Sequence, residues 1–164
     1  KLLQINPVIR LNTSTGRIMQ EIGELAMSHG WESYIAYSQG RDGIKPCKSQ
    51  LVPIGNKWSV RWHGIMTRLF DRHGLASNRA TKDLVKEIER IQPDIIHIHN
   101  IHGYFLNYKI LFDYLSKANI PVVWTVHDVG FIQDIAITIR MHNATSGKRY
   151  VTVVRNKGFF LPVI

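Results

Sequence analysis

Cysteine is nearly absent from this chain, and its scarcity excludes several kinds of protein. The single Cys47 among 164 residues rules out an internal disulfide and a zinc site built from several cysteines, and it suits a reducing compartment. The sequence also has no apolar run of membrane-spanning length and no secretory hydrophobic segment. We therefore expect a soluble cytoplasmic protein that acts in solution or at the inner face of the membrane.

Acidic residues are scarce as well. The chain has 12 Asp and Glu residues against 21 Lys and Arg residues, which gives a formal net charge of +9. Such a charge favours anionic partners, among them phosphorylated ligands, membrane surfaces and nucleic acid. No RNP, helix-turn-helix or zinc-finger pattern is present, so we expect no nucleic-acid partner. Four arginines of the middle region form either a solvated basic face or a contact with acidic lipid: Arg61, Arg68, Arg72 and Arg79.

Two segments of similar design carry the strongest structural signal. Residues 93–100 (PDIIHIHN) and 121–128 (PVVWTVHD) each start at proline, continue as an apolar run and end in polar residues. This pattern is typical of buried parallel strands, and open α/β sheets bind ligands outside the carboxyl ends of such strands. The first candidate site residues are therefore the polar side chains at the two strand ends: His99, Asn100, His127 and Asp128.

The periodicity of apolar residues predicts the other elements. Two further strands are expected, at residues 1–6 and 31–37. Amphipathic helices are expected at residues 16–30, 60–70, 81–91 and 108–117. Several glycines and a proline after residue 37 indicate a loop or a hairpin. Because strands alternate with helices, we predict one α/β domain, a Rossmann-like parallel sheet with helices on both faces.

The segment between the first strand and its helix, residues 12–17 (NTSTGR), has the composition of a ligand-binding helix start. Hydroxyl residues such as Thr15 cap helices, Gly16 lets a ligand approach the backbone, and free N–H groups with Arg17 would bind a phosphate or a sugar hydroxyl. The plainer interpretation is a helix cap alone. The segment is neither a GxGxxG fingerprint nor a Walker loop, which disfavours a dinucleotide site or a P-loop.

The histidines of the two strand segments permit more than one role. His97 and His99 share a strand face and suggest a metal pair, but no third ligand lies near them in the sequence, so we expect no metal site. We expect instead one buried histidine and one in the cleft. His127 would act as a general acid or base, or would bind a substrate hydroxyl, and Asp128 would orient it or bind a second hydroxyl. The alternative is a strand-end histidine bonded to a loop carbonyl. His102 is expected in an exposed loop.

Four segments in this order resemble the N-terminal half of bacterial family 4 glycosyltransferases. They are residues 12–18 (NTSTGRI), 67–74 (TRLFDRHG), 93–107 (PDIIHIHNIHGYFLN) and 121–128 (PVVWTVHD). The resemblance covers residues 1–128 and implies the N-terminal, acceptor-side domain of a GT-B fold, in which two Rossmann-like domains face each other across a cleft. It implies transfer of a hexose from a nucleotide sugar to a saccharide or lipid-linked acceptor.

The resemblance also assigns roles to particular residues. Thr15, Gly16 and Arg17 would face the phosphates of the donor and the acceptor, and His127 would touch the donor sugar near the reacting centre. It implies no metal and no cofactor, because cationic side chains and a helix N-terminus offset the charge of the leaving diphosphate and the nucleotide sugar is a substrate. A chain of 164 residues has no room for the second, donor-binding domain, so we expect the isolated chain to be inactive. The alternative is a non-catalytic half that retains only acceptor or membrane-surface binding.

The tail, residues 129–164, departs from the family pattern. Family members continue after the His-Asp pair with Cys-Trp, a Thr-Gly-His-Cys-like run and Cys-Pro-Gln, none of which is present here. The genetic code permits these runs in a shifted codon frame, which suggests a frame change near Asp128. Residues 135–141 alternate between apolar and polar, residues 143–148 resemble a turn and residues 150–154 are β-rich, so the tail could form a β-hairpin that would pack on the sheet edge or pair with another copy. The sequence leaves the oligomeric state open.

Overall fold

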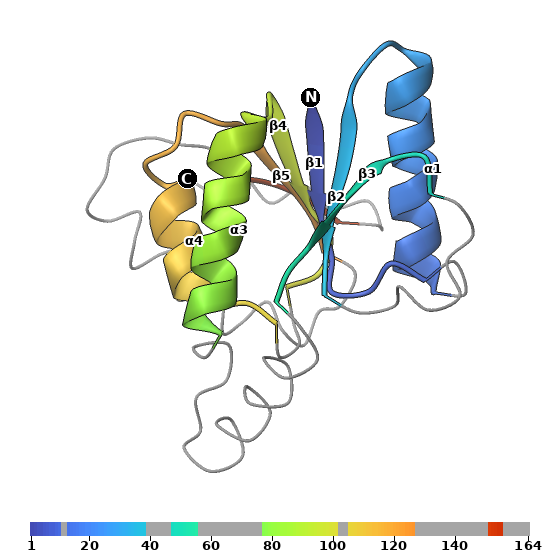
Figure 1. Cartoon of the computed structure of the whole chain (residues 1–164). Helices are drawn as coiled ribbons and strands as arrows, with labels where there is room; N and C mark the ends of the chain where they lie inside the picture. The colour runs from blue at the N-terminus through green and yellow to red at the C-terminus, as the bar shows by residue number, and fades with distance from the viewer. Residues whose placement is uncertain (11–12, 39–46, 56–76, 102–104, 127–150, 156–164) are drawn as a thin grey trace.

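A parallel sheet forms the centre of the protein (Figure 1). The structure is a computed structural model that describes residues 1–10, 13–38, 47–55, 77–101, 105–126 and 151–155. Within these residues the sheet has six strands: β1 (Leu2–Ile5), β2 (Ser33–Tyr37), β3 (Gln50–Pro53), β4 (Ile95–Ile98), β5 (Val122–Val126) and β6 (Val151–Arg155).

The strand order is β3-β2-β1-β4-β5-β6, and all five neighbouring pairs are parallel. This is the order of a doubly wound Rossmann sheet, in which the direction of winding reverses between β1 and β4. Strand β1 lies at that reversal, and all four of its residues are buried. Leu2 of β1 is in register with Ser33 of β2 and with Ile95 of β4. The predicted α/β fold class is confirmed.

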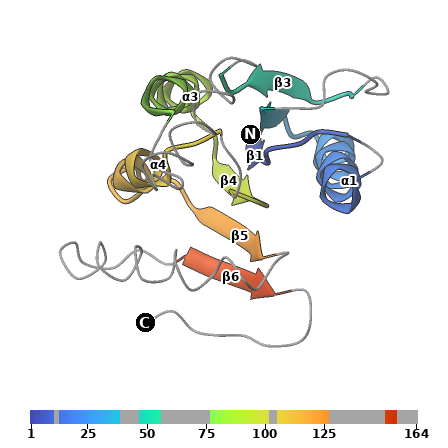
Figure 2. The same cartoon turned by 90° about the horizontal axis from the view of Figure 1, so that it is seen from below.

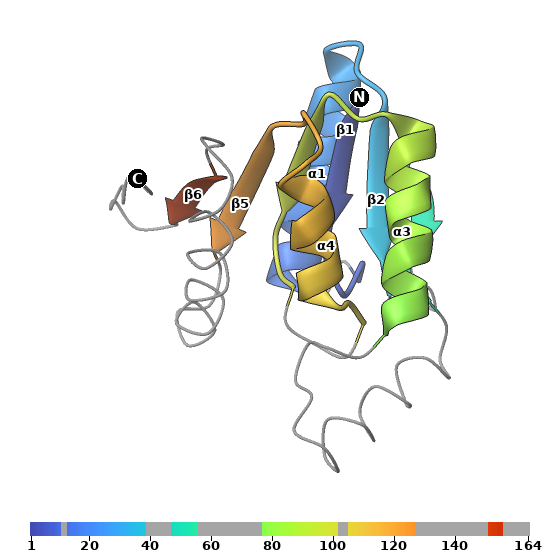
Figure 3. The same cartoon turned by 90° about the vertical axis from the view of Figure 1, so that its left-hand side faces the viewer.

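Helices cover both faces of the sheet (Figures 2 and 3). Helix α1 (Ser14–Ser28) packs on one face, and α3 (Asn78–Ile91) and α4 (Tyr108–Leu115) lie side by side on the other. The larger core lies between the sheet and α3 and α4. It includes Leu3, Ile5, Leu84, Ile88, Ile98, Leu111 and Trp124. The helix predicted at residues 60–70 lies outside the described residues.

A smaller core lies under α1. It consists of Ile9, Met19, Ile35 and Tyr37. Helix α1 ends where the sequence predicts, because Gly30 adopts φ +80°, a conformation that glycine reaches without a Cβ clash. The Gly30 N–H donates to the carbonyl of Met27 at 3.0 Å, and the Trp31 N–H donates to the carbonyl of Ala26 at 3.1 Å. This pair of bonds is a Schellman motif, and it turns the chain into β2.

Strand β3 stands where the sequence analysis expects a loop or a hairpin. It pairs in parallel with β2, and Gln50, Leu51 and Pro53 are exposed while Val52 is buried. The Ile54 N–H donates to the Tyr37 carbonyl at 2.6 Å. Successive backbone nitrogens alternate in direction along a strand, so the nitrogen of Pro53 points away from β2. A proline is tolerated there because no ladder bond is lost, and it also blunts the outer edge of the sheet.

Strand β6 belongs to the tail. It lies beside β5 over five residue pairs, from Val122 with Val151 to Val126 with Arg155 (Figure 2). Part of the tail thus lies at the sheet edge, one of the two placements expected for a folded tail. The first arm of the predicted hairpin, residues 135–141, lies outside the described residues, so that hairpin stays a prediction.

Candidate functional site

The carboxyl edge of β1 leads into the loop that starts α1. Thr13 is the N-cap residue of α1, and its hydroxyl accepts a hydrogen bond from the Gly16 N–H at 3.2 Å. The same hydroxyl donates to the Arg10 carbonyl at 2.7 Å, and the Thr13 N–H donates to that carbonyl at 3.1 Å. Thr13 thus folds the loop onto the first helical turn, and Thr15 is half-buried within this turn. A cap satisfies only part of the helix start, because the first four N–H groups of a helix have no partner within it.

Gly16 is buried, and its missing side chain allows this tight loop. A Cβ at Gly16 would overlap the Arg10 carbonyl oxygen and would lie 2.6 Å from the Thr13 hydroxyl. The overlap involves backbone, which cannot rotate away as the end of a side chain can. Gly16 therefore has a structural reason to be glycine, besides the ligand approach expected from the sequence.

We expect Gly16→Ala to lower the free energy of unfolding by about 1–3 kcal/mol, because the loop must move to relieve the overlap. Chemical denaturation of the two proteins measures this change. Gly23→Ala in the same helix is the matched control. Its Cβ would meet the side-chain oxygens of Ser49 at 2.6 Å and Ser33 at 2.9 Å, and hydroxyl groups adjust at lower cost. If Gly16→Ala proved stabilising, as helix propensity alone predicts, the close packing would not matter.

Arg17 lies in the first turns of α1 and points to solvent. Its side chain is 65% exposed, and its Nε lies 3.7 Å from Oε1 of Glu21. An exposed pair of this kind contributes at most about 1 kcal/mol. The guanidinium is therefore available to an anionic ligand at little cost to the fold.

His99, a candidate from the sequence, is buried beneath the carboxyl edge. It is 1% exposed, and its Nε2 lies 2.9 Å from Oε1 of Gln4 on β1. The other end of the Gln4 amide, Nε2, donates to the Met19 carbonyl at 2.8 Å. A carbonyl can only accept, so the Gln4 amide orientation is fixed, and His99 must carry its proton on Nε2 to bond Oε1. Gln4 thus links the first half of α1 to β4.

His97 continues this polar chain across the sheet. It is half-buried, and its Nε2 lies 2.8 Å from the hydroxyl oxygen of Thr125 on β5. The rings of His97 and His99 are tilted by 32° with centroids 4.0 Å apart. Polar side chains therefore connect β1, β4 and β5 on the face that α1 covers. Both histidines form hydrogen bonds within the fold. Because His99 is buried, it lies beneath the surface of the candidate site and holds neighbouring residues in place.

The remaining candidates divide into those the structure places and those it does not. Asn100 is half-buried and is the second residue after β4, next to His99, whose N–H donates to the Ile5 carbonyl at 3.0 Å. The structure thus brings the ends of β1 and β4 together. His127, Asp128 and the loop residue His102 lie outside the described residues, and their roles stay predictions.

Three polar residues of this edge were missed in the sequence analysis. Gln4, Asn6 and Ser38 look like ordinary strand residues in the sequence. Gln4 and Asn6 are 0% and 1% exposed, and Ser38 is half-buried. The only sequence signal is a polar residue within or directly after an apolar strand. Such a residue needs a partner, since burial of an unbonded polar group is costly.

A comparison with protein families decides the identity. The model of glycosyltransferase family 4 matches residues 16–155. The chain belongs to glycosyltransferase family 4. WcaC of Escherichia coli K12, which is named as a glycosyl transferase of colanic acid biosynthesis, is 27% identical over 137 residues. The aligned part covers 77% of this chain and 33% of WcaC, so the chain spans about a third of that relative. No solved structure matches the chain.

The resemblance noted from four sequence segments is thus confirmed as family membership. The family match reaches residue 155, beyond residue 128, where the resemblance ends in the sequence analysis. The domain boundary at residue 128 and the origin of the tail stay predictions. In this family 4 chain the described helices include none long and apolar enough to cross a membrane. Within the described residues no group of three or more His, Cys, Asp or Glu side chains is placed to hold a metal ion.

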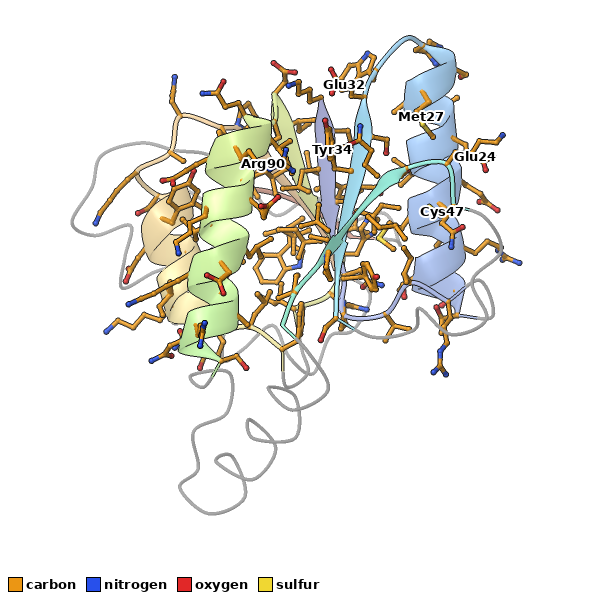
Figure 4. All side chains as sticks on the ribbon, in the orientation of Figure 1. Glu24, Met27, Glu32, Tyr34, Cys47 and Arg90 are labelled. Carbon is orange, nitrogen blue, oxygen red and sulfur yellow. The ribbon has the colours of Figure 1, made fainter. Side chains whose placement is uncertain are left out.

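A groove of about 300 Å³ lies elsewhere on the domain, between β3 and the last turns of α3. Two of its polar side chains are already paired: Tyr34 donates to Glu32 at 2.7 Å, and Arg90 donates through Nη2 to Glu87 at 2.8 Å. Figure 4 shows where Glu32, Tyr34 and Arg90 lie. The bond to Glu32, together with burial, raises the pKa of Tyr34, and the bond to Glu87 raises the pKa of Arg90. The groove lies toward the amino ends of the strands, away from the edge where parallel sheets bind ligands.

Proposed function

We propose that this family 4 domain is the acceptor-side half of a glycosyltransferase that moves a hexose from a nucleotide sugar to a saccharide or lipid-linked acceptor. The observation that carries the proposal is the tight start of α1 at the carboxyl edge of β1. There Gly16 packs against the Arg10 carbonyl, and the exposed Arg17 lies beside the helix N-terminus. This edge is the ligand-binding edge of a Rossmann sheet.

The chemistry of glycosyl transfer gives this arrangement a use. As the bond to the sugar breaks, negative charge develops on the leaving diphosphate. A helix N-terminus carries roughly half a positive charge, and Arg17 adds a full one. Charges that are fixed in place before the reaction stabilise the transition state without reorganisation. We propose that His127 and Asp128, which follow β5, act at the reacting sugar, and that no metal or cofactor takes part.

A second domain is part of the proposal. A diphosphate bound from one side leaves the donor sugar without a fixed position, and precise placement is a major source of rate enhancement. The relative WcaC is longer, since the aligned part covers 33% of it. We therefore propose that a second domain completes the donor site and that the chain alone does not turn over. A lipid-linked acceptor would place the enzyme at the inner face of the membrane.

Assays of the purified chain with nucleotide hexoses, alone and with a separately expressed second domain from a family 4 relative, test this function. We expect transfer to saccharide or lipid-linked acceptors only when both domains are present. If the chain binds acceptor or anionic vesicles but no second domain restores transfer, it is a non-catalytic binding module.

Replacing Arg17 with alanine should weaken binding of UDP by about 1.5–3 kcal/mol, roughly 10- to 150-fold, because a charge-assisted contact is lost. Isothermal titration in low salt measures this loss. The melting temperature should barely change, since the pair with Glu21 is exposed. Arg90→Ala is the control. Arg90 is similarly exposed at 64% and paired with Glu87, but it lies near the amino ends of the strands, away from the start of α1. An equal, salt-dependent loss in both variants would mean that the positive charge acts diffusely.

A further inference from the structure

Asn6 is the residue that directly follows β1, and it is almost completely buried at 1% exposure. Its backbone N–H donates to the Ala36 carbonyl at 3.1 Å, which continues the ladder to β2. Its side-chain Nδ2 donates to the Val8 carbonyl at 2.6 Å. Because a carbonyl only accepts, this bond fixes which end of the amide is nitrogen. The position of Oδ1 follows from the contact and does not depend on an arbitrary choice of amide orientation.

The Oδ1 atom of Asn6 has no hydrogen-bond partner in the described part of the chain, although it is buried. An acceptor left in this way lowers stability, and nearly all buried polar atoms in folded proteins are bonded. The fold therefore keeps a buried acceptor unsatisfied when a hydrophobic residue would avoid the cost. A buried polar group of this kind needs an explanation, and a bound ligand or an ordered water can supply the missing hydrogen bond.

The location of Asn6 indicates which ligand that is. Side chains alternate along a strand, so Asn6 lies on the same face as Gln4, the face that α1 covers. It stands at the end of β1 from which the loop to α1 departs, with Thr13 and Gly16 at the far side of that loop. Asn6 therefore lies at the same end of the sheet as the start of α1, whose first N–H groups have no partner within the helix.

A hydroxyl group fits both partners, because it donates one hydrogen bond and accepts others. A diphosphate offers only acceptors and cannot satisfy Asn6 Oδ1. We propose that Asn6 is a specificity-determining residue whose Oδ1 accepts a hydrogen bond from one hydroxyl of the bound acceptor saccharide. This inference rests on the proposed function, since it assigns a residue to the acceptor side of that site. A site built to bond a particular hydroxyl rejects the analogue that lacks it.

The test is a titration of the full chain, labelled with ¹⁵N, with methyl glycosides of glucose, galactose and mannose and with the monodeoxy analogues of each. For a glycoside that binds, we expect one deoxy analogue to bind at least about fivefold more weakly. Asn6→Ala should weaken binding of the parent glycoside by a similar factor. The variant should bind the parent glycoside and that deoxy analogue with equal affinity. The side-chain amide signals of Asn6 should shift on binding to the unaltered chain.

Two further variants keep the test decisive. Asn6→Ser also removes the amide oxygen, and its hydroxyl can donate to the Val8 carbonyl, which is useful if Asn6→Ala fails to fold. Ser49→Ala is the control, because the Ser49 hydroxyl is also buried but already donates to the Ser33 hydroxyl at 2.9 Å. We expect Ser49→Ala to leave the discrimination between parent and deoxy glycosides unchanged.

The outcomes separate this inference from the proposed function. If the unaltered chain binds a glycoside but the Asn6 variants bind it equally well, the inference is wrong and an ordered water alone meets Oδ1. If Asn6→Ala and removal of the hydroxyl each weaken binding and their factors multiply when combined, the two groups do not interact, and the inference is also wrong. If the unaltered chain binds none of the glycosides, the acceptor role of the domain fails together with the inference.

Discussion

Replacement of His127 with alanine, in an enzyme that carries both domains, is expected to lower turnover by at least about 10²-fold while the fold survives. A positioned acid, base or hydroxyl ligand is worth about 10² to 10⁴ in rate. His127 directly follows β5, and the carboxyl end of β5 lies at the ligand-binding edge of the sheet. The measurement is the rate of hexose transfer at saturating donor and acceptor, with the melting temperature as a check on folding.

His29→Ala is a suitable control for this prediction. His29 is an exposed histidine at the C-cap of α1, and this end of the helix is remote from the carboxyl edge of the sheet. Its replacement should leave turnover within about threefold, since no reacting group is near. If the two variants lose activity equally little, His127 has only a structural role, such as a bond to a loop carbonyl, and the catalytic centre must lie elsewhere.

The elements that the sequence predicted well are those with a strong local pattern. Strands β4 and β5 are short apolar runs behind a proline, and burial on both faces of a parallel sheet requires such runs. Helix α3 was predicted at residues 81–91 but begins three residues earlier, at Asn78, because Asn78 and Arg79 are polar and exposed and give no apolar signal. The end of α1 near Gly30 was predicted because a left-handed helix end needs glycine.

Strand β3 could not be predicted in this way. Its apolar run is short and is interrupted by Pro53, and a proline inside a run argues against a strand. Its pairing with β2 depends on a neighbouring strand more than ten residues away in sequence, and edge strands are defined by that neighbour more than by their own composition. A local pattern predicts the centre of a sheet better than its edge.

The polar interactions of the site were the least predictable part. Gln4 and His99 are 95 residues apart in sequence, and only the register of β1 with β4 brings them together. The sequence predicts one buried and one cleft histidine in this segment, with His99 as the site candidate, but the structure buries His99 and leaves His97 half-buried. Gln4 was not predicted, because a single glutamine in an apolar strand has no pattern of its own. Which buried polar side chains hydrogen-bond to each other is decided by the tertiary fold.

The contribution of the Gln4 hydrogen bonds to stability can be measured. Gln4→Met keeps the length of the side chain but leaves the Met19 carbonyl and the His99 Nε2–H without their bonds to residue 4. Each buried polar group that loses its partner costs about 1–3 kcal/mol, so we expect the free energy of unfolding to fall by about 2–5 kcal/mol. Urea denaturation should show a lower midpoint with an unchanged m-value, because the fold remains compact.

Gln20→Met separates this effect from the replacement of any buried glutamine. Gln20 is also buried, at 7% exposure, but its amide makes one bond, from Nε2 to the Ile9 carbonyl at 3.2 Å. Its loss should cost about 1–2 kcal/mol, clearly less than the loss at Gln4. Equal losses at the two positions would show that His99 gains nothing from Gln4. In that case the first half of α1 and the end of β4 are held together by apolar packing, and the tautomer of His99 is set by another contact.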